Sequence, residues 1–376
     1  MTAPATQEIH GFVAPGFEPV RDAFAANFAA GLEVGAAFAA TVEGKPVVDI
    51  WAGHRDANGT VPWEKDTIAC VFSTTKATVA LSAAMLVDRG LLEYEQPVAK
   101  YWPEFAQEGK GSITVGQLLS HQAGLPGVTN RPLPDWYNWT AITEALAAEK
   151  PWWEPGTANG YHAITFGHLN GEVIRRISGK SFGTFLRDEI AGPLGADFQC
   201  GLPASDDART AFMISPPAME MPADAMLAKA LANPPFDTNQ ANDRAYRAAE
   251  IPAANGHGNA RSIARIMSAL ACGGTVDGVR LLSEESIAKA ITEQCYRPDL
   301  GLMIPMRWGA GFMMRSDSLP LGPNERIFGH GGAGGSLGIA DMDAKLSWSY
   351  VMNKMSATTT GDARAASVGL TLYGCL

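Results

Sequence analysis

Strand-like spacing of apolar residues at both ends of this chain is the feature that most restricts its fold. Near the N-terminus, runs at residues 34–42 and 47–51 flank a glycine-containing turn, which predicts an antiparallel hairpin. Near the C-terminus, runs at residues 336–341 and 346–352 flank a second turn and predict another hairpin. Because strands joined by tight turns pair side by side, each end of the chain contributes two antiparallel strands.

Helical spacing accompanies both hairpins. Apolar residues recur at helical intervals over residues 17–32, and a final helix is expected over residues 362–373. Strands and helices at both ends predict one antiparallel sheet flanked by helices and built from both termini. We assign residues 1–95 and 250–376 to this part of the molecule.

Residues 96–249 have a different pattern. Helical spacing dominates, with helices expected over residues 141–148, 166–177 and 182–190. Residues 202–252 are rich in Met, Pro and Ala without a clear period, and they are too apolar to be a solvated linker. The sequence therefore predicts an α+β fold, with a mainly helical domain whose irregular segment caps a cleft that holds the active site.

Composition and charge exclude several classes of protein. Hydrophobic residues make up 46% of the 376 residues, so a large core is available, and this excludes a disordered chain. The net charge is −10, from 29 Lys and Arg against 39 Asp and Glu, with no basic run. Nucleic-acid binding needs a concentrated positive surface, so no nucleic-acid partner is expected. An anionic membrane surface would repel the chain as well.

Cysteine usage and the N-terminal sequence bear on location. The cysteines are odd in number, widely scattered and without a Cys-x-x-Cys pair, which favours reduced thiols over a disulfide framework. The N-terminus has neither the basic nor the apolar region of a signal peptide, and no apolar run is long enough to span a membrane. We expect a soluble, cytoplasmic protein with no membrane span, and the oligomeric state stays open.

The sequence Ser73-Thr74-Thr75-Lys76 is the first candidate for chemistry. It follows a short apolar run and opens a helix expected to continue to about residue 89, so the hydroxyl and the amine lie on one helix face. A serine and a lysine in this spacing form the nucleophile and base of one class of serine hydrolases. A second copy, Ser286-Ile287-Ala288-Lys289, follows the helix cap Ser283 and is expected on a solvated helix face.

Two further segments can complete a site with this pair. Tyr161 follows a loop rich in Pro and Gly, where a phenol can face a cleft and relay a proton. His330-Gly331-Gly332 precedes a strand, and glycines there let a substrate carbonyl approach the backbone closely. Trp152 and Trp153 belong to a group of aromatic residues that can wall an apolar substrate pocket, although a core role is equally open.

Together these motifs resemble those of the serine β-lactamase and penicillin-binding-protein superfamily. The order and separation of Ser73-x-x-Lys76, Tyr161 and His330-Gly331-Gly332 carry the resemblance, which extends over nearly the whole chain. The chain is most similar to family VIII carboxylesterases, which share the class C β-lactamase fold. The resemblance implies a β-lactamase/transpeptidase-like fold with Ser73 as nucleophile and Lys76 and Tyr161 as proton carriers. It also implies an oxyanion hole made by the backbone N–H groups of Ser73 and Ala333.

Two positions depart from the lactamase pattern. Ala163 stands where that pattern has an asparagine, and His330 stands where it has a lysine. Because those two residues help recognise a lactam, the resemblance favours a serine carboxylesterase acting on a short-chain ester as its small-molecule substrate. A β-lactamase or D-amino-acid peptidase remains an alternative, as does an inactive binding protein of the same fold.

Other catalytic motifs fail. Gly334-Gly335-Ser336-Leu337-Gly338 matches the nucleophile elbow of α/β-hydrolases, but that fold needs a histidine after the serine, and every histidine precedes Ser336. His162 and His168 are six residues apart and have no Cys or carboxylate cluster beside them, which argues against a metal site. We expect neither a metal nor a cofactor.

Overall fold

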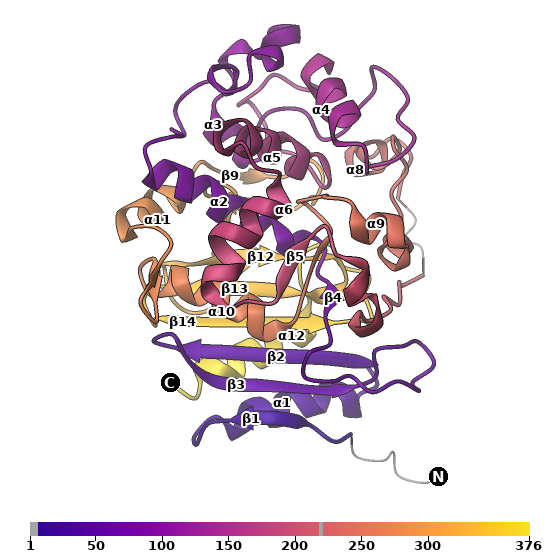
Figure 1. Ribbon diagram of the computed structural model, residues 1–376, viewed down its shortest axis with the longest axis vertical. Coiled ribbons are helices and arrows are strands. Elements are labelled where there is room, and N and C mark those ends of the chain that lie inside the picture. Colours follow the sequence, from indigo (N-terminus) through magenta and orange to yellow (C-terminus); the bar gives the residue numbers. More distant parts are fainter. Residues whose placement is uncertain (1–6, 218–220) are drawn as a thin grey trace.

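A nine-stranded antiparallel sheet forms the centre of the structure, a computed structural model that describes residues 7–217 and 221–376 (Figure 1). The strand order is β1-β3-β2-β14-β13-β12-β11-β10-β9. The strands are β1 (His10–Val13), β2 (Gly35–Val42), β3 (Lys45–Gly53), β9 (Cys295–Pro298), β10 (Pro305–Trp308), β11 (Met313–Met314), β12 (Ile327–Gly331), β13 (Leu337–Asp341) and β14 (Leu346–Met352).

The two predicted hairpins meet in the middle of this sheet. β2 pairs with β3, β13 pairs with β14, and β14 pairs antiparallel with β2, where Trp348 lies opposite Ala40. This pairing joins the two ends of the chain, so the predicted sheet built from both termini is confirmed. In Figure 1 the yellow C-terminal strands lie directly beside the indigo N-terminal strands.

Helices cover both faces of the sheet. Side chains alternate between the two faces along a strand, and β14 shows both environments. Ser347 donates a hydrogen bond to the carbonyl of Ala264 in α10 (Ala260–Ala271). On the other face, Trp348 contacts Gly369 in α12 (Ala363–Tyr373), and Tyr350 bonds to Asn27 in α1 (Glu18–Ala29). The predicted first and last helices are therefore present and pack together.

The remaining helices lie mainly between the predicted boundaries of the helical part. α2 (Lys76–Asp88) packs against α5 (Thr165–Ser178) and α11 (Glu284–Ala290). The other helices are α3 (Val115–Leu119), α4 (Trp139–Ala148), α6 (Phe182–Phe185), α7 (Gly192–Leu194), α8 (Met226–Ala230) and α9 (Arg244–Ala248). The helices expected over residues 141–148 and 166–177 are confirmed, whereas the domain boundaries themselves stay a prediction.

Three segments differ from expectation. The continuous helix expected over residues 182–190 breaks into α6, a wider π-helical turn over Leu186–Ala191, and α7, because Pro193 cannot donate the next helical hydrogen bond. The irregular cap contains α8 and α9. The strands β9, β10 and β11 were not expected, and neither were β5 (Phe198–Cys200), which pairs with β6 (Gly256–Gly258), and the small β7 (Thr275–Val276) and β8 (Val279–Arg280) pair.

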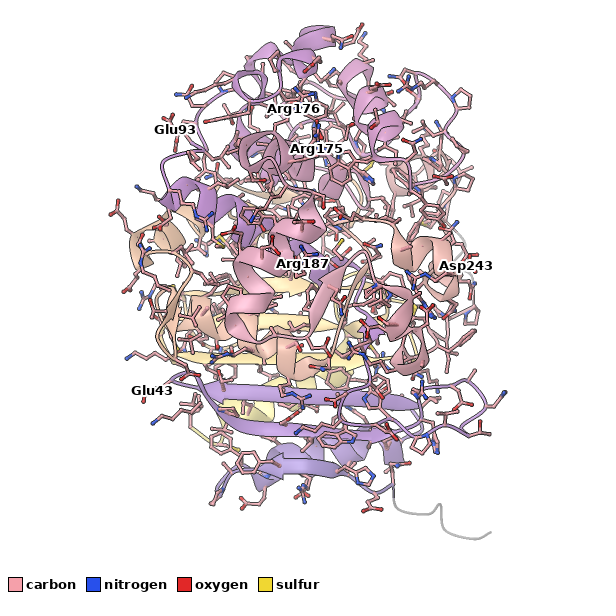
Figure 2. The ribbon with its side chains drawn as sticks, viewed as in Figure 1. Glu43, Glu93, Arg175, Arg176, Arg187 and Asp243 are labelled. Atoms are coloured by element: carbon pink, nitrogen blue, oxygen red, sulfur yellow. The ribbon has the colours of Figure 1, made fainter. Side chains whose placement is uncertain are left out.

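Charged side chains are spread around the outside of the molecule. Glu43 at the sheet end and Glu93 and Arg176 at the helical end are exposed, as Figure 2 shows. Arg176 pairs with the carboxylates of Glu172 and Glu104, so its positive charge is locally balanced. In the described parts of the chain, no helix has both the length and the apolar character needed to cross a membrane.

Candidate active site

A strained turn presents Ser73 at the start of α2. The chain leaves the short strand β4 (Ala69–Cys70), and Phe72 has a positive φ of 44°, which a bulky residue rarely adopts. Ser73–Thr75 then form a single 3₁₀ turn that continues into α2. Strain of this kind persists only where the surrounding structure enforces it, and it is common at active sites.

The Lys76 side chain lies beneath this turn and is fully buried. Its Nζ atom lies 2.9 Å from Ser73 Oγ, 2.7 Å from the carbonyl oxygen of Ala163 and 2.9 Å from that of Ala253. Burial lowers the pKa of Lys76 well below its usual value, because the charged ammonium is poorly solvated here. No carboxylate contacts the amine among the described residues to oppose this effect.

Tyr161 completes the predicted constellation. Its ring lies 4.8 Å below Lys76 Nζ, and the residue borders the same pocket as Ser73. Burial raises the pKa of Tyr161, so the phenol stays protonated through neutral pH. Within the described parts of the chain the hydroxyl makes no hydrogen bond of normal geometry, which leaves it free to bond a substrate oxygen.

Asp299 holds the backbone of Tyr161 in place, a role that was not predicted from the sequence. The carboxylate, which is buried, accepts hydrogen bonds from the Tyr161 N–H at 3.0 Å and the Asn159 side chain at 2.8 Å. It also accepts bonds from the N–H groups of Gly301 and Leu302. A single aspartate in a loop carries no recognisable motif, so only the fold reveals the contact.

The His330 side chain lies behind Tyr161 rather than in the pocket. It is fully buried, and its ring centroid lies 6.2 Å from that of Tyr161 and 5.8 Å from that of Trp308. Burial lowers its pKa to about 3, so the imidazole is neutral at pH 7. His121 packs on the same rings, with its centroid 4.9 Å from that of Tyr161. The ring of His330 therefore supports Tyr161, in contrast to the expected contact with substrate.

The two expected oxyanion donors border the same pocket. Neither the Ser73 nor the Ala333 N–H donates a hydrogen bond to any other described residue. The end of β12 packs tightly on the nucleophile turn, because a side chain at Gly332 would collide with the Val71 carbonyl. Gly331 and Gly332 thus act through close backbone packing and are not among the pocket-lining residues.

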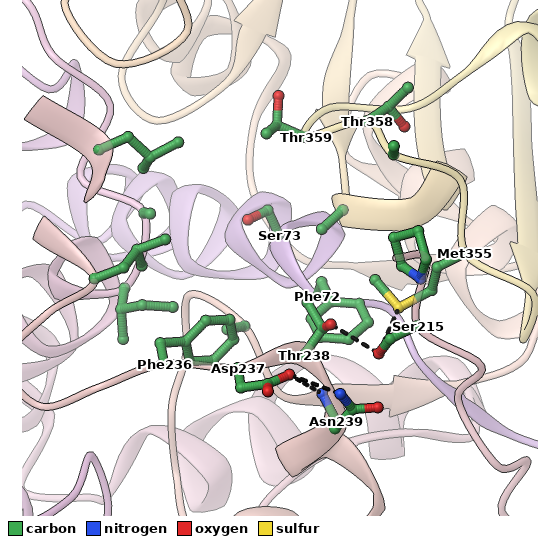
Figure 3. Close-up of a pocket in the computed structure, with 18 of the residues that line it drawn as sticks. Phe72, Ser73, Ser215, Phe236, Asp237, Thr238, Asn239, Met355, Thr358 and Thr359 are labelled. Carbon is green, nitrogen blue, oxygen red and sulfur yellow. Dashed lines mark hydrogen bonds between the residues drawn. The ribbon is translucent and has the colours of Figure 1, made fainter. Parts of the chain in front are cut away.

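The pocket at Ser73 has a volume of about 390 Å³ (Figure 3). One side is apolar and includes side chains from residues 202–252, the segment predicted as a cap. Hydroxyl groups line the other side, where Ser215 bonds to Thr238. The lining residues that shape it are Phe72, Ile164, Met221, Leu227, Leu231, Phe236, Asp237, Thr238, Asn239, Met355, Thr358 and Thr359.

Trp152 and Trp153 do not line this pocket. The Trp152 indole donates to Glu149, and that of Trp153 donates to the carbonyl of Ala158. Their rings fill the space beside Gly127 and Gly160, where the absence of a side chain admits them. The structure thus places both in the packing around the helical part, the alternative that the sequence had left open.

The rival serines have structural roles. Ser336, in the sequence that matches a nucleophile elbow, is fully buried and donates to the Val71 carbonyl. Ser286 bonds to Asp88, while Lys289 pairs with Glu285 on the surface of α11, away from Ser286. In residues 7–217 and 221–376, no group of three or more His, Cys, Asp or Glu side chains is placed to hold a metal ion.

The chain is similar to known proteins in both sequence and overall structure. The sequence profile of the family described as Beta-lactamase matches residues 24–373. Esterase/beta-lactamase LipL of Mycobacterium tuberculosis (strain ATCC 25618 / H37Rv) is 35% identical, over 97% of this chain and 88% of its own. A solved family VIII carboxylesterase is 47% identical with a TM-score of 0.92, covering 98% of this chain and 100% of that one. A penicillin-binding protein homologue from Caulobacter crescentus is 42% identical with a TM-score of 0.92 over the same shares.

Proposed function

This chain belongs to the beta-lactamase family and is a serine carboxylesterase, and we propose that it cleaves esters through an acyl-enzyme formed on Ser73. The observation that carries the assignment of Ser73 is its 2.9 Å contact with the buried amine of Lys76 at the edge of a pocket. A serine hydroxyl is a weak nucleophile unless an adjacent base removes its proton.

Lys76 is the base in this proposal. A neutral amine has two N–H bonds and one lone pair, and the carbonyls of Ala163 and Ala253 can accept from both N–H groups. The lone pair then faces Ser73 Oγ. As Ser73 attacks the ester carbonyl, its proton moves to Lys76, and the N–H groups of Ser73 and Ala333 bond the developing oxyanion.

Tyr161 delivers a proton to the leaving alcohol. Its hydroxyl is protonated and makes no hydrogen bond of normal geometry to a described residue, so it can donate to the alkoxide oxygen as the carbon–oxygen bond breaks. The proton held by Lys76 restores the Tyr161 hydroxyl. Water then attacks the acyl-enzyme through the same groups in reverse order, which releases the acid and regenerates Ser73.

The substrate is proposed to be a small, uncharged ester with a short acyl chain. The alternatives are not favoured: the relatives include esterases, and an inactive binding protein would need none of Ser73, Lys76 and Tyr161. A cytoplasmic location and the absence of nucleic-acid partners stay predictions based on composition.

Labelling with a serine-directed phosphonate tests the assignment of the nucleophile. Mass spectrometry is expected to find one adduct, on the peptide that contains Ser73, and Ser73→Ala is expected to abolish both labelling and ester hydrolysis. Ser286→Ala is the matched control, because it removes the serine of the second Ser-x-x-Lys sequence, which is buried against Asp88 and not solvated as expected. An adduct on Ser336, or full activity of Ser73→Ala, contradicts the proposal. p-Nitrophenyl esters of increasing chain length then define the preferred acyl group.

A further inference from the structure

The loop that carries Ala333 rests on a buried arginine from the last helix. Residues 332–336 join β12 to β13, and Gly334 is the residue directly after Ala333. That carbonyl accepts a hydrogen bond from Nη2 of Arg364 at 2.6 Å and another from the N–H of Ser356 at 3.0 Å. The Arg364 side chain is only 6% exposed, so this contact is shielded from water.

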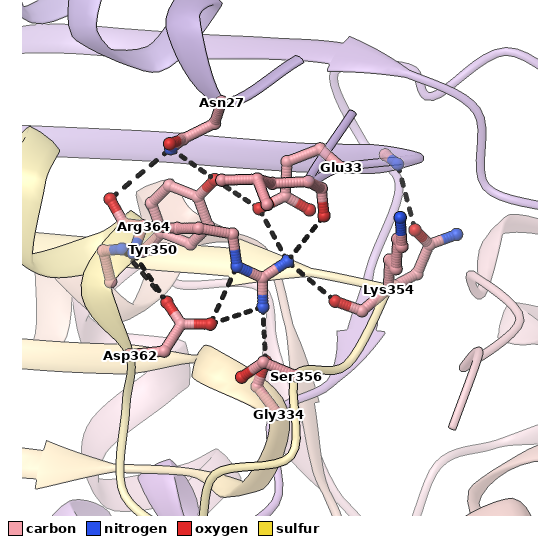
Figure 4. A network of polar contacts seen from close by, with 12 residues as sticks. Asn27, Glu33, Gly334, Tyr350, Lys354, Ser356, Asp362 and Arg364 are labelled. Atoms are coloured by element: carbon pink, nitrogen blue, oxygen red, sulfur yellow. Dashed lines mark hydrogen bonds and ion pairs between the residues drawn. The ribbon is translucent and has the colours of Figure 1, made fainter. Parts of the chain in front are cut away.

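The guanidinium of Arg364 joins four separate segments of the chain, as Figure 4 shows. Its Nε and Nη2 atoms both bond to Asp362, and Nη1 bonds to the carbonyls of Leu32 and Lys354. Nη1 also lies 3.0 Å from Glu33 Oε1, which accepts a hydrogen bond from Tyr350. Every N–H of the guanidinium therefore has an acceptor, and these bonds together fix the orientation of the group toward the Gly334 carbonyl.

Glycine residues allow the loop to approach this closely. Gly334 and Gly335 have φ values of 85° and 125°, which side chains disfavour. A Cβ atom on Gly335 would lie 2.6 Å from Asp362 Oδ2 and 2.8 Å from Arg364 Nη2. The backbone beside Ala333 thus lies directly on the ion pair, with no side chain between them.

We propose that Arg364 is a positioning residue for the oxyanion hole, which fixes the Ala333 N–H toward Ser73 by holding the Gly334 carbonyl. The inference rests on the proposed function, because it assumes that Ala333 bonds an ester oxyanion. A lysine could keep the charge, but its single nitrogen cannot occupy the places of Nε, Nη1 and Nη2, from which the guanidinium reaches Asp362, Lys354 and Gly334.

A purely structural role is the competing explanation. Arg364 also joins the N-terminal and C-terminal helices, so its loss destabilises the protein and lowers activity in any case. The two explanations differ in whether the loss of activity depends on the carbonyl oxygen of the substrate. A displaced Ala333 N–H weakens the bond to the carbonyl oxygen, whereas general damage affects every substrate equally.

Thionoesters separate the two explanations, because their sulfur is a weaker hydrogen-bond acceptor than the ester oxygen. We would measure kcat/KM for p-nitrophenyl butyrate and its thiono analogue with the wild type, Arg364→Lys and Arg265→Lys. Arg265 lies on α10, where it pairs with Asp277, and is the matched control. Arg364→Lys is expected to lower kcat/KM for the oxygen ester by about 10- to 100-fold and the oxygen-to-sulfur ratio at least about fivefold. Arg265→Lys is expected to leave the ratio unchanged.

An equal loss for both esters in folded Arg364→Lys, or no loss, overturns the inference. Asp362→Asn provides a second variant in case Arg364→Lys does not fold. It retains the arginine but removes the carboxylate that orients the guanidinium toward Gly334. A lowered ratio in that variant supports the inference, and an unchanged ratio overturns it. Ser73→Ala tests the proposed function separately. Full activity of Ser73→Ala would contradict the role of Ser73 as nucleophile, whereas it would not bear on the contact between Arg364 and Gly334.

Discussion

Lys76 Nζ lies 2.9 Å from Ser73 Oγ, and both remaining contacts of the amine are backbone carbonyls. This arrangement suits a neutral amine that can accept a proton. A charged ammonium would have no carboxylate partner among these contacts. A second buried lysine, Lys110, offers an internal comparison, because its Nζ contacts three carbonyls and no hydroxyl. Burial lowers the pKa of Lys110 only to about 8.

Replacing Lys76 is therefore expected to stop catalysis, whether or not charge is kept. Lys76→Ala removes the base, and Lys76→Arg substitutes a group that does not deprotonate in proteins, so each is expected to lower kcat at least about 10²-fold. Lys110→Met serves as the control: it removes a buried amine and costs stability, yet its folded fraction is expected to keep the wild-type kcat. Near-normal turnover by Lys76→Arg would refute the role of Lys76 as base.

The same amine sets the direction of the pH dependence. The neutral form is active, so kcat/KM is expected to rise as the pH increases through the pKa of the site and to fall below it. Burial lowers the pKa of Lys76, which places this rise well below the pH at which a free lysine titrates. The apparent value belongs to the Lys76–Tyr161 pair, since the two groups are in contact. A rise only near the pKa of free lysine, about 10.4, would contradict a buried neutral base.

Tyr161→Phe is expected to be most harmful with poor leaving groups. An alkoxide needs a proton as it leaves, whereas p-nitrophenolate leaves without one, so loss of the phenol affects alkyl esters far more. We expect kcat for ethyl butyrate to fall about 10²- to 10⁴-fold, and that for p-nitrophenyl butyrate to fall much less. Equal losses on both esters would show that Tyr161 does not protonate the leaving group.

Strongly periodic segments explain why much of this site could be predicted from sequence. The hairpins at both ends have clear strand spacing, and the Ser73–Lys76 pair lies within one helical turn, although α2 itself is buried on nearly every side. The strands β9 and β10 lack such spacing, because each contains a proline and the loop between them holds a glycine and three exposed apolar residues. They form because neighbouring strands supply the hydrogen bonds.

Long-range contacts account for the residues that sequence could not identify. Asp299 bonds to Tyr161 across 138 positions, and Arg364 bonds to Gly334 across 30. Neither residue is part of a local motif, so its role exists only in the folded chain. His330 is a different case: its motif was expected to precede a strand, whereas His330 lies within β12 and its side chain packs against Tyr161 and Trp308.

Glu33 is expected to make stability depend on pH. Burial raises its pKa from 4.5 to about 7, because the charged carboxylate is poorly solvated there and the nearby Arg364 only partly offsets this loss. A raised pKa favours the protonated form on folding, so this contribution is fully present below about pH 4.5 and is lost as the pH rises through 7. Compared with Glu33→Gln, the wild type should lose about 3 kcal/mol of unfolding free energy over this range. Urea unfolding at pH 4.5 and 8 measures it, with exposed Glu43→Gln as control, and parallel curves for wild type and Glu33→Gln would contradict it.

Esters are expected to be much better substrates than β-lactams. Ala163 borders the pocket without the amide that could bond an acylamino group, and the neutral, buried His330 presents no charge to a carboxylate. Of the described residues that line the pocket, Asp237 is the single charged one, and it repels an anionic antibiotic.

An unmet polar contact can lower kcat/KM by orders of magnitude, whereas an ester needs only the nucleophile, the proton carriers and the oxyanion hole. We therefore expect kcat/KM for p-nitrophenyl butyrate to exceed that for nitrocefin by at least about 10²-fold. Asp237→Asn should raise the nitrocefin value roughly two- to fivefold and the neutral ester value less, because it removes the like charge. Equal or greater efficiency on nitrocefin would make lactam hydrolysis the principal activity and overturn the preference for esters.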